Sequence, residues 1–128
     1  MTVSYDQWLS WILEAARHIA SREYQEQAWF PGAKYRSSPH EVYLTLMEDR
    51  LFDRFFETYG SSFTDEQTQS WKELRQRLEE YYDSLPTHPD PLLVLTDPAW
   101  EKVRESARIF VEAFATKIRG SEPTPDQG

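Results

Sequence analysis

The sequence of 128 residues contains no cysteine and no asparagine, and only four glycines. The absence of cysteine excludes disulfide bonds and thiolate metal sites. The absence of asparagine excludes N-linked glycosylation. The glycines stand apart from one another, so the sequence offers no glycine-rich loop for binding phosphate: Gly32, Gly60, Gly120 and Gly128.

Basic residues are also scarce, because 14 Lys and Arg stand against 22 Asp and Glu, which gives a formal net charge of −8. A protein that neutralises nucleic-acid phosphates needs a basic surface, so this balance argues against a nucleic-acid partner. It favours solubility and a basic partner. Apolar residues make up 39% of the chain and aromatic residues 15%, which is too much for a disordered acidic segment. We therefore expect a folded, acidic protein.

Long apolar runs are absent too. No stretch approaches the roughly 18 consecutive apolar residues that a membrane-spanning helix needs. The first twenty residues lack a basic beginning and include Asp6 and Glu14, so they do not look like a signal peptide. We predict a cytoplasmic protein without contact to membranes.

What the sequence does contain is helical periodicity with capping residues. Four helices are predicted: the first from about Tyr5 to about Gln27 after a cap at Ser4, the second from Pro39 to Gly60 after Ser38, the third from Thr64 to Leu85, and the fourth from Asp97 to Gly120. Gly60 is expected to end the second helix in a left-handed conformation. The residues Asp90-Pro91 are suited to cap one further short helical turn.

No segment alternates apolar and polar residues over the length of a strand. The pattern predicts an all-α protein, most simply a bundle of four mostly antiparallel helices formed by a single domain of residues 1–120. The aromatic-rich loop after the first helix, which contains Trp29, Phe30 and Tyr35, is expected to pack on one end of this bundle. Residues 121–128 are predicted to be a disordered tail.

Catalytic signatures are missing from this pattern. His40-Glu41 begins like a zinc-protease motif, but Leu44 occupies the position of the second histidine. Glu14 and His18 are spaced as neighbours on one helical face, which is more typical of a surface contact than of a ligand pair. We therefore predict no enzyme activity, no cofactor and no metal.

Glu48 is an unusual carboxylate, because a regular helix would place it between Leu44, Leu51 and Phe55 on the apolar face. A buried carboxylate must find a donor or take up a proton. Three interpretations remain open: an internal ion pair with an arginine such as Arg17, exposure on a face that meets a partner, or a functional group in a pocket.

The negative charge is unevenly distributed along the chain. Residues 1–38 and 99–128 each carry as many bases as acids, whereas residues 39–60 carry five acids against two bases and residues 61–98 carry eight against three. The whole net charge therefore comes from the middle of the chain.

Some of these acids stand where a helix would not place them for its own stability. Asp49, Asp53 and Glu57 form a like-charge row at spacings of four, and the carboxylates in 79–83 oppose the negative end of their helix. A solvated face is the simpler interpretation. The alternative is a binding surface for a basic partner, in which one of two tyrosines stays exposed beside the acids. Its predicted residues are Glu79, Glu80, Tyr81, Tyr82, Asp83, Asp49, Asp53 and Glu57.

The run Glu79-Glu80-Tyr81-Tyr82-Asp83 resembles a feature of bacterial immunity proteins, the inhibitors of colicin-type nucleases and of contact-dependent growth-inhibition toxins. The helical members of that family carry an acidic residue shortly before Tyr-Tyr-Pro, whereas here the proline is displaced to Pro86. The resemblance implies a stoichiometric inhibitor that covers a cationic toxin surface, and it implies no catalysis. In the family the tyrosine pair lies on a very short helix, which differs from the long helix predicted here.

Two other functions stay open at this level. The first is an adaptor or scaffold that binds a protein through the Trp29-Phe30-Pro31 loop, which an exposed apolar patch would support. The second is a ligand-binding or enzymatic bundle with Glu48 in an internal cavity. In each case we expect a monomer or a weak dimer.

Overall fold

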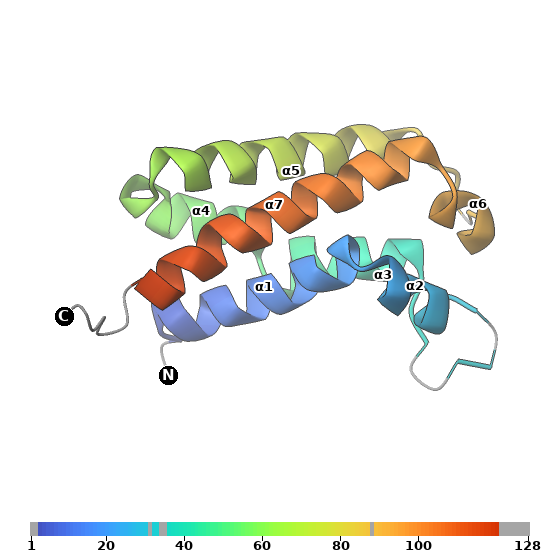
Figure 1. Ribbon diagram of the computed structural model, residues 1–128, viewed down its shortest axis with the longest axis horizontal. Helices are drawn as coiled ribbons and strands as arrows, with labels where there is room; N and C mark the ends of the chain where they lie inside the picture. Colours follow the sequence, from blue (N-terminus) through green and yellow to red (C-terminus); the bar gives the residue numbers. More distant parts are fainter. Residues whose placement is uncertain (1–2, 31, 34–35, 88, 121–128) are drawn as a thin grey trace.

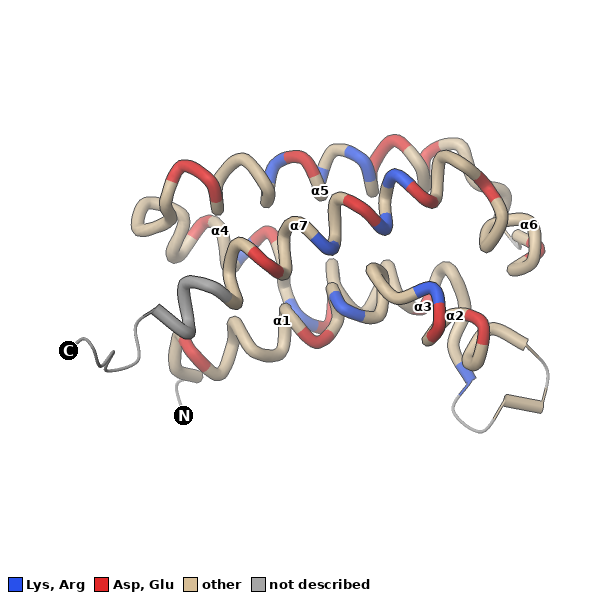
Figure 2. Tube along the Cα trace, viewed as in Figure 1, with Lys and Arg blue, Asp and Glu red and all other residues tan. Residues whose placement is uncertain are grey.

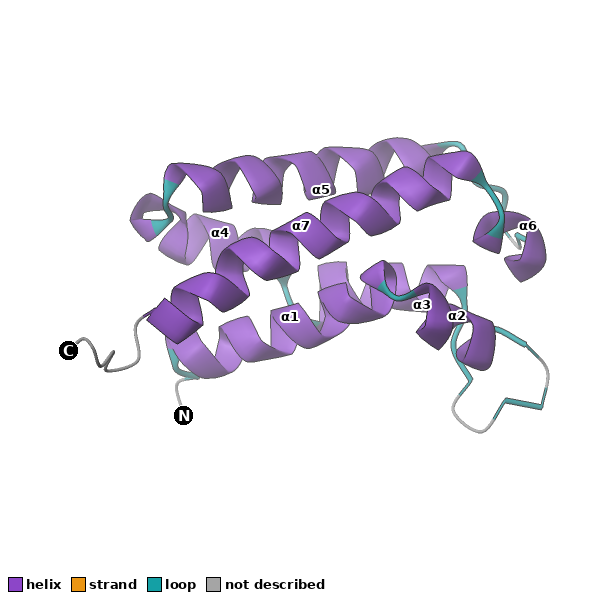
Figure 3. Ribbon diagram, in the orientation of Figure 1, coloured by secondary structure: helices purple, strands orange, loops and turns teal. Residues whose placement is uncertain are grey.

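The computed structural model describes residues 3–30, 32–33, 36–87 and 89–120. This part of the chain is helical and contains no strand (Figure 3). None of its helices combines the length and the apolar character needed to cross a membrane. The predicted all-α class is thus confirmed, whereas the predicted tail, 121–128, lies outside the described residues.

The long helices α1 (Tyr5–Ala20), α5 (Asp65–Asp83) and α7 (Pro98–Gly120) form the frame of the molecule. Helix α7 packs against both α1 and α5 (Figure 1). The apolar face of α7 supplies large side chains that are fully removed from water, namely Trp100, Phe110 and Phe114. Burial of such aromatic side chains is the main source of stability in a domain of this size.

The first predicted helix is divided into α1 and α2 (Arg22–Ala28). Ser21 leaves the helical conformation with φ −98° and ψ 105°, and its side chain accepts a hydrogen bond from the backbone of Tyr24. The break frees backbone carbonyls at the end of α1, and the buried amide of Gln25 donates to two of them, those of His18 and Ile19, at 2.9 and 2.8 Å. A capping serine inside a periodic segment is therefore what ends α1.

The second predicted helix is also divided, into α3 (Pro39–Leu44), a π-helical turn η1 (Thr45–Asp49) and α4 (Phe52–Tyr59). Leu51, between η1 and α4, adopts a left-handed conformation with φ 55°. The wider π turn and this residue change the phase of the helix, so Phe52 and Phe55 face the core while Leu44 and Leu51 are exposed. The prediction of one regular helix, and with it the count of four helices, is wrong.

Gly60 does not adopt the predicted left-handed conformation, since its φ is −58° and it begins a short 3-10 turn, η2 (Gly60–Ser62). The capping side chains predicted at the helix starts are confirmed, and at Ser4 and Ser38 the serine accepts from the backbone of the third residue after it. Thr64 and Gln67 form a reciprocal capping box at α5, Asp90 caps α6 (Pro91–Leu95), and the side chain of Asp97 accepts from the backbone of Ala99 at the start of α7. Helices α2 and α6 contact each other at one end of the molecule (Figure 1).

Candidate interaction surface

The C-terminal half of α5 meets α4 at an arginine. Arg75 donates two hydrogen bonds to the carboxylate of Asp53, at 2.9 and 3.1 Å, and a third to Glu79 at 3.3 Å. The hydrogen bonds that Arg75 donates to Asp53 raise the pKa of Arg75 above its ordinary value. Two acidic residues that are far apart in the sequence thus share one guanidinium.

Tyr43 of α3 lies beside this group. Its ring stacks on Tyr82 with centroids 4.3 Å apart. Burial raises the pKa of Tyr43; the charge of Arg75 lowers it, and those of Asp83, Glu79 and Asp53 raise it. Arg75 joins Asp53 to Glu79, and Asp83 lies one turn after Glu79 on the exposed side of α5, so we define the acidic face as Tyr43, Asp53, Arg75, Glu79 and Asp83.

The acidic face is open to water. Side chains of Asp53 and Glu79 are 44% and 60% exposed, and Asp83 is exposed as well. Along α5, acidic residues occur near the beginning and the end, with basic residues between them (Figure 2). Two carboxylates on one guanidinium, with the carboxylate of Asp83 one turn further along the helix, leave this end of α5 with an excess of negative charge.

The two tyrosines of the predicted surface are structural. Tyr81 is 7% exposed and its hydroxyl donates to Asp97 at 3.0 Å, which joins the end of α5 to the start of α7. Tyr82 packs among His40, Tyr43 and Trp100, and its hydroxyl donates to the carbonyl of Pro39. Burial raises the pKa of both phenols above the ordinary value. The expectation that one tyrosine stays exposed is therefore wrong, because both sides of α5 are covered at this point.

The other predicted acids do not join this group. Glu80 accepts from Gln76 at 3.0 Å and lines a hollow that it shares with Lys72, Glu73 and Arg77, away from Arg75. Asp49 lies on the π turn and lines a separate groove. Glu57 is exposed one turn after Asp53. Sequence reasoning missed Tyr43 and Arg75; the spacing of four between Arg75 and Glu79 was the available signal for the arginine.

Glu48 is exposed on the π turn and does not lie in the core. The apolar arc that a regular helix would form around it does not exist, because the π turn and Leu51 interrupt the helix there. Trp29 is equally far from its predicted role, since it is 3% exposed and packs on Trp100 with ring centroids 5.8 Å apart. Phe30 is half-buried, and Pro31 lies outside the described residues.

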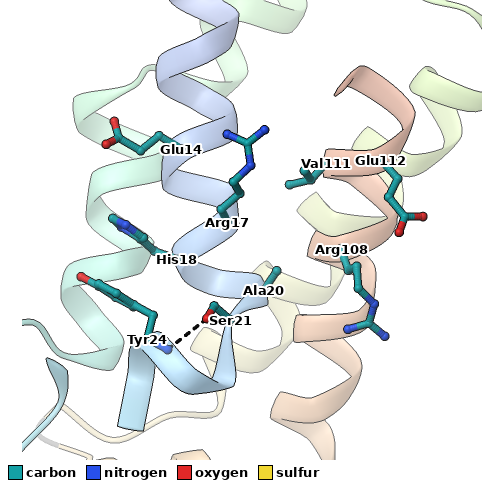
Figure 4. A pocket seen from close by; sticks show the side chains of 9 residues that line it. All are labelled: Glu14, Arg17, His18, Ala20, Ser21, Tyr24, Arg108, Val111 and Glu112. Carbon is teal, nitrogen blue, oxygen red and sulfur yellow. Dashed lines mark hydrogen bonds between the residues drawn. The ribbon is translucent and has the colours of Figure 1, made fainter. Parts of the chain in front are cut away.

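An open cleft of about 590 Å³ separates α1 and α2 from α7 (Figure 4). Its walls carry charges of both signs, from Glu14, Arg17, Arg108 and Glu112. His18, whose ring stacks on Tyr24 with centroids 4.0 Å apart, also lines it, and burial lowers the pKa of this imidazole. No group of three or more His, Cys, Asp or Glu side chains in the described part of the chain could hold a metal ion.

Searches of protein-family models, of curated proteins and of solved structures found no match to this chain. The function is therefore inferred from the arrangement of the residues. Of the features described, the acidic face joins acids from both acidic segments of the sequence.

Proposed function

We propose that this protein is a non-catalytic inhibitor that binds a basic protein, with a toxin domain such as a nuclease as the partner and the cytoplasm as the location. The observation that supports this function is the acidic face, in which Asp53 and Glu79 share Arg75 while Asp83 lies close by. A toxin that binds nucleic acid must carry a basic surface, and an inhibitor of complementary charge would cover it.

The acidic face has the chemistry of such an inhibitor. Exposed carboxylates attract a cationic partner from a distance and raise the rate of association. Arg75 holds two of them in place, so less side-chain freedom is lost when the partner binds. Tyr43 adds an aromatic ring of the kind that is enriched at energetically important positions of interfaces.

The two alternative functions depend on an exposed Trp29 and on a buried Glu48, and neither side chain has that position. An adaptor that uses the Trp29-Phe30-Pro31 loop needs an exposed Trp29, but this side chain is buried in the core. A ligand-binding bundle that uses Glu48 needs an internal carboxylate, but Glu48 is exposed. We therefore propose inhibition alone.

The test is charge reversal in the acidic face. If a toxin-like reading frame stands upstream of this gene, its product is the partner to use, and the double variant Glu79→Lys and Asp83→Lys should abolish binding to it, measured by isothermal titration calorimetry. Helical content, measured by circular dichroism, should be unchanged because both side chains are exposed.

A matched control is the double variant Glu23→Lys and Glu26→Lys, in which exposed acids of α2 are reversed. It changes the net charge of the protein by the same amount, so it should weaken binding far less than reversal in the acidic face. Equal loss in the two variants would show that only total charge matters. Unchanged binding after reversal of Glu79 and Asp83 would exclude the acidic face as the binding site.

A further inference from the structure

A groove of about 380 Å³ lies between α1 and the junction of η1 with α4. Aromatic and aliphatic side chains form most of its wall: Trp8, Trp11, Leu51 and Tyr59. Thr58 of α4 also lines it, whereas Asp53 of the same helix contacts α5. The groove is therefore separate from the acidic face.

Two large apolar side chains of this groove are exposed to water, Trp11 at 38% and Leu51 at 51%. Trp8 forms the more rigid wall, since it packs edge-on against Phe55 and its indole N–H donates to the carbonyl of Arg50 at 2.8 Å. A concave apolar surface with a preformed wall binds an apolar group by removing both from water.

The backbone at Leu51 gives a second, independent observation. Its φ of 55° and ψ of 54° are left-handed, which costs an L-residue free energy that glycine would not pay. The preceding segment is a π turn, a feature that is frequent at functional sites. A strained and exposed leucine adds little to the stability of the free protein, so its side chain is better explained by an occupant of the groove.

The charges at the rim indicate the kind of occupant. The exposed carboxylate of Asp49 lines the groove, and the guanidinium of Arg50 lies 3.5 Å from the carboxylate of Glu14. Arg50 also lines the groove, but its guanidinium is paired with Glu14, which lies outside the groove. Asp49 is then the exposed charge of the groove, and it favours a cationic segment. A second copy of this chain would instead bring like charges together, since each copy has a formal charge of −8.

We propose that the groove of Trp8, Trp11, Leu51 and Tyr59 receives an aromatic or aliphatic side chain from a basic polypeptide segment. This inference rests on the proposed function only for the charge of the partner. The groove supplies the apolar contact that an interface built on charge alone lacks, and such buried apolar anchors carry most of the binding energy in many interfaces.

The test uses three short synthetic peptides. The first has a central Phe-Leu pair between lysines, the second has two serines in place of Phe-Leu, and the third has glutamates in place of the lysines. Binding is followed by NMR through the indole N–H signals of Trp8 and Trp11, assigned with Trp8→Phe and Trp11→Phe variants. We expect the first peptide to shift these signals and to bind about tenfold or more tightly than either of the other two.

The decisive variant is Leu51→Gly, which removes the exposed side chain and suits the left-handed backbone. It should lower the affinity for the Phe-Leu peptide several-fold, while Leu93→Ala, which removes a 68% exposed leucine from α6, should not. Equal affinities in these two variants would overturn the proposal. Equal binding of the Phe-Leu and serine peptides would also overturn it, because attraction would then come from charge alone.

Self-association is the competing outcome. If sedimentation shows dimers of the wild-type protein that Leu51→Gly abolishes, a second copy occupies the groove and the cationic partner is excluded. The failure of the groove and the failure of the proposed function are also distinguishable. Reversal of Glu79 and Asp83 tests only the acidic face, whereas the peptides and Leu51→Gly test only the groove.

Discussion

At the scale of single residues, the Gln25 side chain makes four hydrogen bonds inside the protein. It is completely buried, its amide donates to two carbonyls at the end of α1, and its carbonyl oxygen accepts from Trp100 at 3.0 Å and Arg104 at 3.1 Å. Arg104 in turn donates to Glu101, which lowers the pKa of that carboxyl. One amide therefore joins the α1–α2 break to α7.

We expect Gln25→Met to lower the free energy of unfolding by about 3 kcal/mol or more, because three buried polar groups and one partly buried carbonyl lose a partner, and each buried loss costs about 1–3 kcal/mol. Urea unfolding followed by circular dichroism measures the change. Gln27→Met is the matched control, since Gln27 is exposed on the same helix, and it should change the free energy by less than about 0.5 kcal/mol. Similar values for the two variants would mean that the Gln25 network is energetically unimportant.

At the scale of helices, the junction between η1 and α4 stores backbone strain at Leu51. We expect Leu51→Gly to raise the free energy of unfolding by about 0.5–1 kcal/mol, because relief of the left-handed penalty exceeds the entropic cost of glycine. Leu44→Gly is the contrast, since Leu44 is similarly exposed but has helical φ and ψ of −65° and −37°. Leu44→Gly should lower the free energy of unfolding by about 1 kcal/mol. An equal decrease in the free energy of unfolding for Leu51→Gly and Leu44→Gly, measured by thermal unfolding, would contradict backbone strain at Leu51.

Helix boundaries show what the sequence could and could not predict. The caps at Ser4, Ser38 and Thr64 depend on neighbours within three residues, and the structure has all of them. The positions of Glu48 and Leu51 depend on a change of helical phase, which a regular periodicity cannot reveal. The wrong prediction for Glu48 and the unpredicted groove at Leu51 therefore have one cause.

The acidic face was predictable only in part for a similar reason. Local spacing identifies Asp53, Glu79 and Asp83 as acids in unfavourable positions, but the contact between α4 and α5 through Arg75 is tertiary. The prediction for the tyrosine pair was wrong because both hydroxyls donate to residues outside α5, that of Tyr81 to Asp97 and that of Tyr82 to Pro39. Packing of α5 between neighbours decides which of its residues remain available.

At the scale of the whole molecule, the acidic face and the apolar groove lie at different contacts of α4. Exposed carboxylates gather where α4 meets α5, while the exposed Trp11 and Leu51 lie where α4 meets α1. The exposed carboxylates attract cationic groups over about 10 Å at moderate salt, whereas the groove binds an apolar side chain only on direct contact. The proposed basic partner would therefore be attracted by the acidic face and retained by the groove.

This division predicts how the two rate constants of binding respond to salt. Between about 0.05 and 0.5 M sodium chloride, the association rate with the basic partner should fall steeply while the dissociation rate changes little, as stopped-flow fluorescence would measure. The double variant Glu79→Gln and Asp83→Asn, which removes these two charges without reversing them, should remove most of the salt dependence of association. Leu51→Gly should leave that dependence intact and accelerate dissociation instead. An association rate that does not change with salt would contradict attraction by the acidic face, because added ions screen the attraction between exposed charges on two proteins.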